Sequence, residues 1–192
     1  MIELAIGAAV VVAASALARA VLQNRLDREA SAKRSAEELA RLIDPRRDVR
    51  VGDVLLHLGE SLWLSGSIEF DEEGQRFTLF RSPENADISW VFQLDEEGRE
   101  WALLSECRDI PEGAVPVQLR LGGRLLSLER RGRASARGKG EHLPKLTPKA
   151  SFTILSDAGG KMAVIIDFEK GERLSLLGDR KERALLDVLP GS

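Results

Sequence analysis

The stretch Ile88-Ser89-Trp90-Val91-Phe92-Gln93-Leu94 places a large apolar residue at every second position. Successive side chains of a strand point to opposite faces of its sheet, so this spacing predicts a strand with one face in a hydrophobic core. The same alternation recurs in residues 62–70, 117–121 and 162–168. Half-buried strands of this kind are typical of antiparallel sheets.

Working outward, the remaining strand signals have similar lengths and are separated by glycine-containing turns. They cover residues 51–57, 76–81, 100–105, 124–129, 151–155, 173–177 and 183–189. About eleven short strands separated by such turns predict a mainly β domain over residues 51–192. We expect an antiparallel β-sandwich or a barrel-like fold.

A weak internal repeat supports this interpretation. Residues 70–79 read FDEEGQRFTL, and residues 94–103 read LDEEGREWAL, an offset of 24 residues. In both copies the glycine supplies the positive φ that a tight turn requires. The repeat predicts two similar hairpins in one sheet. The acidic runs lack the alternating ligands of a calcium loop, so we interpret them as solvated hairpin tips.

The N-terminus has a different pattern. Residues 4–18 carry no charge, and Ala20, Val21 and Leu22 extend the apolar run past Arg19. The guanidinium of Arg19 can reach the lipid headgroups along the helix. A helix over residues 2–22 would measure roughly 31 Å, close to the thickness of a bilayer core. Residues 1–22 are therefore predicted to be a transmembrane anchor.

Two alternatives to the anchor stay open: a cleaved signal peptide and a buried helix of a soluble protein. Ala16-Leu17-Ala18 has the small residues of a cleavage site, but the chain opens Met1-Ile2-Glu3 without the basic residues of a signal peptide. The positive charges follow the apolar run instead. The positive-inside rule then places the C-terminal domain in the cytoplasm.

Residues 23–50 are predicted to continue as a helical stalk and linker. The segment up to residue 43 is rich in Arg, Glu, Ala and Leu, and Asp44-Pro45 ends it because a residue before proline disfavours the helical conformation. In the anchor, Ala5, Ala9 and Ala13 recur every four residues, a spacing that would let two membrane helices approach and form a homo-oligomer. An alanine-rich helix also shows this spacing by chance.

Charge is distributed unevenly, although the formal net charge is only -3. Residues 51–129 hold sixteen acidic and six basic side chains, whereas residues 130–149 hold seven basic and one acidic. The glycine, proline and lysine content of residues 130–149 predicts a flexible basic loop. The candidate contacts for an anionic ligand are Arg130, Arg131, Arg133, Arg137 and Lys139. Anionic lipid, nucleic acid and the acidic surface of the domain itself are the three alternatives, and the absence of aromatic residues disfavours nucleic acid.

No catalytic, cofactor or metal motif is found in the sequence, so we predict no catalytic residue, no cofactor and no metal site. The single cysteine, Cys107, excludes an intrachain disulfide and cysteine-pair zinc sites. We interpret Cys107 as an inert thiol because no histidine is near it in sequence. His57 is expected to be structural, and His142 falls in the basic loop. An enzyme that uses side chains dispersed along the chain remains an alternative.

The domain resembles the bacterial domain-of-unknown-function family 4178. The resemblance rests on Val51-Gly52-Asp53, Ser65-Gly66-Ser67-Ile68, Trp101-Ala102-Leu103-Leu104 and residues 166–175, and it covers most of residues 51–192. It implies a β-rich bacterial accessory protein of membrane-associated systems, with no assigned activity and no catalytic residues. Phe77 and Phe168 stand where such proteins often have Trp or Tyr, and the basic segment 130–149 is atypical.

These observations together give one functional hypothesis. We expect a single-pass protein of the bacterial plasma (inner) membrane, with the β domain on the cytoplasmic side acting as a non-enzymatic interaction or accessory module. Its partners would be the membrane, through the N-terminal helix, and another protein. The tether would raise the concentration of the domain near that partner.

Overall fold

The computed structural model describes residues 49–85 and 87–191. They form twelve strands and one short 3-10 helix: β1 (Val54–His57), β2 (Glu60–Trp63), β3 (Gly66–Glu72), β4 (Gln75–Arg81), β5 (Trp90–Gln93), β6 (Glu100–Glu106), β7 (Gln118–Leu121), β8 (Arg124–Gly140), β9 (Lys149–Ser156), β10 (Lys161–Phe168), β11 (Arg173–Glu182), η1 (Arg183–Leu185) and β12 (Asp187–Leu189). The predicted anchor and residues 23–48 of the stalk lie outside the described residues. Within the described part, no helix has the length and apolarity needed to cross a bilayer.

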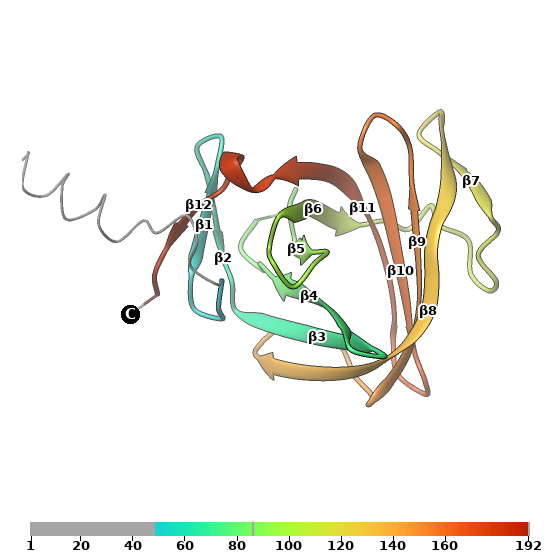
Figure 1. The fold of residues 1–192 in the computed structure, drawn as a ribbon, viewed down its shortest axis with the longest axis horizontal. Helices are drawn as coiled ribbons and strands as arrows, with labels where there is room; N and C mark the ends of the chain where they lie inside the picture. The colour runs from blue at the N-terminus through green and yellow to red at the C-terminus, as the bar shows by residue number, and fades with distance from the viewer. Residues whose placement is uncertain (1–48, 86, 192) are drawn as a thin grey trace, which may run out of the picture. The chain divides into compact units, whose positions relative to one another are not determined.

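Eight antiparallel strands form a closed barrel. Their order is β3-β4-β5-β6-β11-β10-β9-β8, and the barrel closes because β8 also pairs with β3, with Gly66 opposite Gly140. Figure 1 shows β8 turning from its place beside β9 to run beneath β3. Of the two predicted architectures, the barrel is therefore the correct one, and β7 is added at the outer side of β8.

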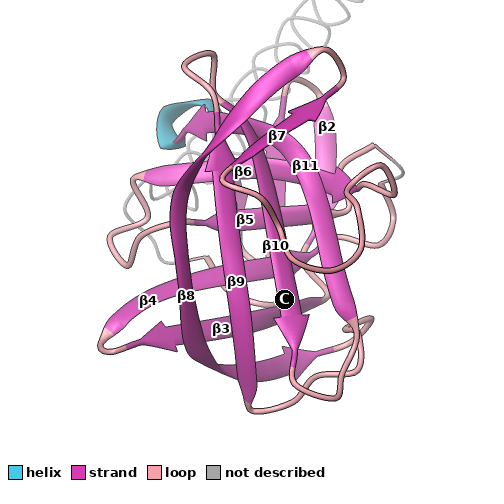
Figure 2. Cartoon of the chain, turned by 90° about the vertical axis from the view of Figure 1, so that its right-hand side faces the viewer, coloured by secondary structure: helices cyan, strands magenta, loops and turns pink. Residues whose placement is uncertain are grey.

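The long strand β8 makes this closure possible. It has 17 residues, pairs first with β7 and β9 and then with β3, and is irregular between Leu128 and Arg130. Figure 2 shows β8, β9, β10 and β11 side by side, with β3 and β4 crossing behind them. The predicted flexible loop over residues 130–149 is therefore wrong for residues 130–140; only residues 141–148 form a loop.

Small residues explain why residues 130–140 of β8 look like a loop in the sequence. After Arg130, the positions of β8 that face the barrel interior are occupied by Gly132, Ala134, Ala136 and Gly138, and charged or polar residues alternate with them. The period is two, as in any half-buried strand, but the inward residues are small. They leave space for phenylalanines from neighbouring strands.

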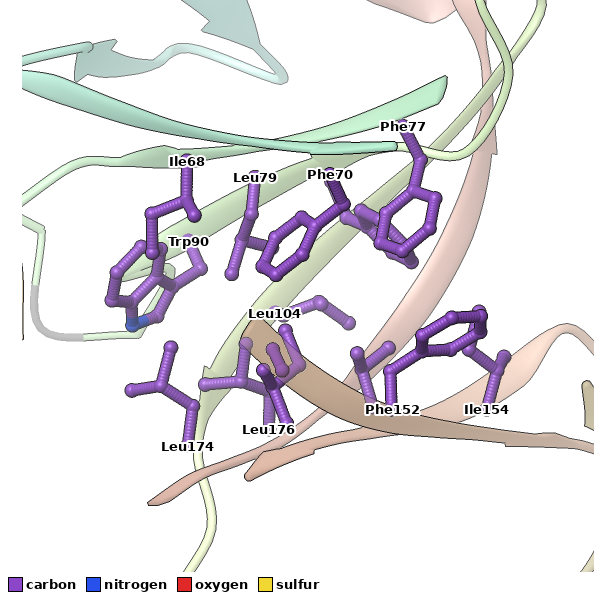
Figure 3. Packing of buried hydrophobic residues seen from close by; sticks show 14 of the residues in the cluster. Ile68, Phe70, Phe77, Leu79, Trp90, Leu104, Phe152, Ile154, Leu174 and Leu176 are labelled. Carbon is purple, nitrogen blue, oxygen red and sulfur yellow. The ribbon is translucent and has the colours of Figure 1, made fainter. Parts of the chain in front are cut away.

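These phenylalanines fill the barrel. Phe70 stacks on Phe77 across the β3–β4 pair at 4.8 Å between ring centroids, and Phe77 also meets Phe92 and Phe152 edge-to-face at 5.7 and 5.0 Å. Phe70 is 6.3 Å from Phe168. Figure 3 shows Phe70, Phe77 and Phe152 packed with leucines and isoleucines between the barrel walls. The interior is thus a packed core, as expected for a barrel of eight strands.

Two further clusters cover the outside of the barrel. The small sheet β12-β1-β2 packs Leu55, Leu62 and Val188 against outward side chains of β4, β5 and β6. On another side, β7 and the segment before it cover Ala163 and Ile165 of β10. Strand β10 is therefore buried on both faces, which accounts for its nearly continuous apolar sequence.

The internal repeat corresponds to two adjacent hairpins of the barrel, β3–β4 and β5–β6, so that prediction is confirmed. Their turns differ. In the first, Glu73 and Gly74 both have positive φ and form a two-residue turn. In the second, the Asp95 carboxylate accepts hydrogen bonds from the backbone N–H groups of Arg99 and Glu100 at 2.8 and 3.1 Å.

Candidate functional site

Arg130, the first of the predicted anionic-ligand contacts, points into the barrel. Its Nε donates to Oε2 of Glu72 at 3.0 Å, and one of its terminal nitrogens donates to Gln75 at 2.9 Å. The guanidinium lies 5.5 Å from the ring centroid of Phe77 and 5.3 Å from that of Phe152. Arg130 and Glu72 therefore cover the phenylalanine core at one end of the barrel, which we call the sealed end.

Arg131 faces outward and is also engaged. Its Nε donates to Oγ1 of Thr153 at 3.2 Å, and Nη2 donates to the carbonyl oxygen of Val115. Val115 belongs to the segment that covers the outer face of β10. Arg131 thus fastens this segment to the barrel wall.

The three remaining predicted residues, Arg133, Arg137 and Lys139, are exposed on the outer face of β8. Lys149 of β9 is exposed opposite Ser135; it lies in the same predicted loop but is not among the predicted contacts. We call these four side chains the basic row. Within residues 49–85 and 87–191 they form no ion pair shorter than 4.0 Å.

Acidic side chains border the basic row on both sides. Arg137 lies opposite Glu69 of β3, and Arg133 lies opposite Ser151, which pairs in turn with Asp167 of β10. The local surface therefore presents a mixed pattern, in which a strand of positive charge runs between carboxylates. A rigid strand holds these charges at fixed spacing, about 7 Å between every second residue.

A pocket of about 610 Å³ lies at the other end of the barrel. Its walls come from the end of β4, the start of β5, residues 106–112, residues 142–144 and the start of β11. We call it the barrel-end pocket. The mouths of β-barrels are common places for small-molecule sites.

The loop 141–148 closes part of this end. The backbone N–H of Glu141 donates to Ser65 O at 2.9 Å, and the N–H of Glu172 donates to Lys145 O at 3.2 Å. Leu143 and Leu146 of the loop pack against the barrel core, and a Cβ on Gly138 would lie 2.4 Å from Leu146 and 3.0 Å from Leu143. Glycine at position 138 therefore leaves room for these two leucine side chains.

An arginine–tryptophan pair lines the pocket. The guanidinium of Arg81 lies 5.0 Å from the ring centroid of Trp90, and its Nη1 donates to Ser89 O at 3.0 Å and is 3.5 Å from Glu106. Trp90 is 1% exposed, and its Nε1 has no hydrogen-bond partner among the described residues. The sequence pattern predicts a core residue at Trp90 and gives no sign of this arrangement.

The pocket also brings Cys107 and His142 to one site. They are far apart in sequence, and sequence reasoning found no histidine near the thiol. His57, in contrast, is buried in the small sheet, where its Nδ1 is 3.3 Å from Leu185 O. Among the described residues, no three His, Cys, Asp or Glu side chains are grouped to hold a metal ion.

Comparison of the chain with protein-family models, curated proteins and solved structures finds no match. The resemblance to domain-of-unknown-function family 4178 therefore stays a prediction. Function has to be inferred from the basic row and the barrel-end pocket.

Proposed function

We propose that this chain is a non-enzymatic binding module, tethered by its N-terminal helix to the cytoplasmic face of a bacterial plasma membrane, and that its basic row contacts an acidic region of a protein partner. The observation that carries the proposal is a set of exposed cations on the outer face of the barrel that form no ion pair with any other described residue: Arg133, Arg137, Lys139 and Lys149. Pairing with β9 at Arg133 and with β3 at Arg137 and Lys139 fixes the backbone of β8, so little backbone entropy is lost on binding.

The mixed charge pattern favours a protein over a lipid surface or a nucleic acid. Phosphates repeat along a nucleic acid and cover an anionic bilayer, so either would meet Glu69 and Asp167 together with the basic row. Like charges brought together oppose binding. A protein can place its own basic groups opposite these carboxylates and its acidic groups opposite the row.

A photo-crosslinker tests the contact in native membranes. Ser135 is exposed between Arg133 and Arg137, so a benzophenone amino acid at Ser135 in the full-length chain should yield one major protein adduct. We expect Arg133→Gln with Arg137→Gln to reduce the adduct by about tenfold or more, since two charge-assisted contacts are lost. The matched control, Arg120→Gln with Lys170→Gln, removes two other exposed cations and should leave it unchanged. Equal loss in both double variants would contradict a role for the basic row.

The tether has its own test. Removal of residues 1–22 should transfer the chain from the membrane fraction to the soluble fraction. A cysteine at exposed position 127, in a Cys107→Ser background, should resist a membrane-impermeant maleimide in intact cells and react after lysis. Labelling in intact cells would contradict the cytoplasmic orientation, and unchanged sedimentation of the truncated chain would contradict the anchor.

A further inference from the structure

We propose that the barrel-end pocket binds a small organic carboxylate with an apolar or aromatic body. This site lies at the loop end of the barrel and does not depend on the proposed function of the basic row. Its volume of about 610 Å³ falls in the range of pockets that hold small ligands.

Part of the pocket lining is apolar. Trp90 and Leu174 of the barrel core line the pocket together with Ile110, Leu143 and Pro144, beside charged side chains of both signs. Contact with these apolar residues removes the body of a ligand from water and leaves its polar group beside the charged ones. A purely polar solute such as inorganic phosphate would gain nothing from it.

Arg81 is the group suited to the carboxylate. Its side chain is 19% exposed, and both of its polar contacts, with Ser89 O and Glu106, use Nη1. Among the residues that the structure describes, Nε and Nη2 bond no acceptor, which leaves them as the two parallel donors that bind a carboxylate. The Trp90 ring and the Ser89 carbonyl fix the plane of the guanidinium beforehand, so the ligand does not have to order it.

Glu106 is a neighbouring carboxylate whose charge opposes that of the ligand. Its side chain is 61% exposed and lies 3.5 Å from Arg81, an ion pair that water screens strongly. When a carboxylate binds Arg81, Glu106 can turn into solvent. The pocket lining also includes the carboxylates of Glu112 and Glu172, and two further guanidinium groups, those of Arg108 and Arg173, balance their charge.

A second arginine–tryptophan pair in the same molecule differs from the first in the hydrogen bonding of its indole nitrogen. Arg183 lies 5.8 Å from the ring centroid of Trp101, whose Nε1 donates to Gly98 O at 2.6 Å. The Nε1 of Trp90 has no such acceptor among the described residues. Burying a donor without a partner costs free energy, and a ligand oxygen would recover it.

This nitrogen is buried, and it belongs to a residue that lines the pocket. Figure 3 shows the nitrogen edge of Trp90 turned toward Leu174, and both residues line the pocket. A rotation of the Leu174 side chain would open Nε1 to a ligand oxygen. Trp90 would then support the ligand with its ring and donate from its edge.

The test uses the full-length chain in lipid nanodiscs and the indole N–H signals of its three tryptophans in a ¹H–¹⁵N spectrum. The probes are benzoate and indole-3-acetate, each with its neutral amide as control. We expect the Trp90 signal to shift saturably with the acids at or below about 10 mM, with the amides binding about tenfold or more weakly, while the Trp101 signal stays in place. No shift of the Trp90 signal, equal affinity of acids and amides, or equal shifts of both tryptophans would each overturn the proposal.

Variants make the test specific. Arg81→Gln should weaken binding of the acids by about tenfold or more, whereas Arg183→Gln, which removes the other arginine–tryptophan contact, should not. Because Arg81→Gln alters a packed side chain, Glu106→Gln provides a second measurement: removing the competing carboxylate should tighten binding of the acids without affecting the amides. Unchanged or weakened acid binding in Glu106→Gln would overturn the role of Arg81.

Discussion

The two ends of the barrel are closed in different ways. At the sealed end, Arg130 and Glu72 lie directly over the phenylalanine core and satisfy each other. At the loop end, a segment outside the barrel wall supplies the cover, and an arginine–tryptophan pair borders an open pocket. Arg130 at the sealed end therefore stabilises the fold, whereas Arg81 at the loop end stays partly available to a ligand.

The largest difference in stability between the two ends should come from the aromatic core. Phe77→Ala removes a ring that contacts Phe70, Phe92, Phe152 and Arg130, so we expect a loss of about 3–5 kcal/mol in the free energy of unfolding. Leu146→Ala in the cover of the loop end should cost about 1–2 kcal/mol, because this side chain is only partly buried. Chemical unfolding followed by tryptophan fluorescence measures both. Similar losses would mean that the two ends contribute equally.

Arg130 should contribute more to the free energy of unfolding than its counterpart Arg81. Arg130→Met keeps part of the apolar stem but leaves the half-buried carboxylate of Glu72 without its partner, so we expect a loss of about 2–3 kcal/mol. Adding Glu72→Leu should recover most of it, because the unpaired charge is then gone. Arg81→Gln should cost about 1 kcal/mol, since Glu106 is exposed. A double variant no more stable than Arg130→Met would contradict this account.

A pair of glycines on β8 compares the ends with the same substitution. A Cβ on Gly132 would lie 1.7 Å from Oε1 of Glu72 and 2.9 Å from Phe152, so Gly132→Ala displaces the ion pair of the sealed end. We expect a loss of about 1–3 kcal/mol. A Cβ on Gly138 meets the ends of two flexible leucine side chains, so Gly138→Ala should cost less than about 1 kcal/mol. The measurement is the unfolding midpoint of each variant. A midpoint for Gly138→Ala as low as that for Gly132→Ala, or lower, would contradict the expectation.

The sequence predicts the strands whose inward residues are large. Residues 88–94 and 162–168 carry the alternation plainly, and the two DEEG turns reveal adjacent hairpins. It predicts the first part of β8, residues 124–129, but not residues 130–140, because Gly132 and Ala134 occupy the inward positions and apolar size is the usual signal for a core face. The role of these small residues is seen only in the folded barrel, where they leave space for the phenylalanines of other strands.

The functional surfaces are harder to predict for a related reason. Arg130 is 58 residues from Glu72, and only closure of the barrel brings them together. The barrel-end pocket combines Arg81, Trp90, Cys107 and His142 from four separate segments. None of these segments carries a motif. In the sequence, Arg130 and Arg133 look equivalent, yet one faces the core and the other faces solvent.

The smallest expected effect concerns pH at the sealed end. Burial by itself raises the pKa of the Glu129 carboxyl, but hydrogen bonds from Ser156 and Arg180 and the charge of Arg180 together hold the pKa below its ordinary value of 4.5. A carboxyl with a lowered pKa in the folded state stabilises the fold above its unfolded-state pKa, and this stabilisation is lost as pH falls through the folded-state pKa. Glu129→Gln should therefore flatten the decline in unfolding free energy below about pH 4.5, by less than about 1 kcal/mol because the group is partly exposed. Glu84→Gln, at an exposed carboxyl far along the chain, serves as the control for loss of one charge. If both variants follow the same pH profile, the Ser156 and Arg180 contacts add nothing to the sealed end, and its stability rests on Arg130, Glu72 and the rings beneath them.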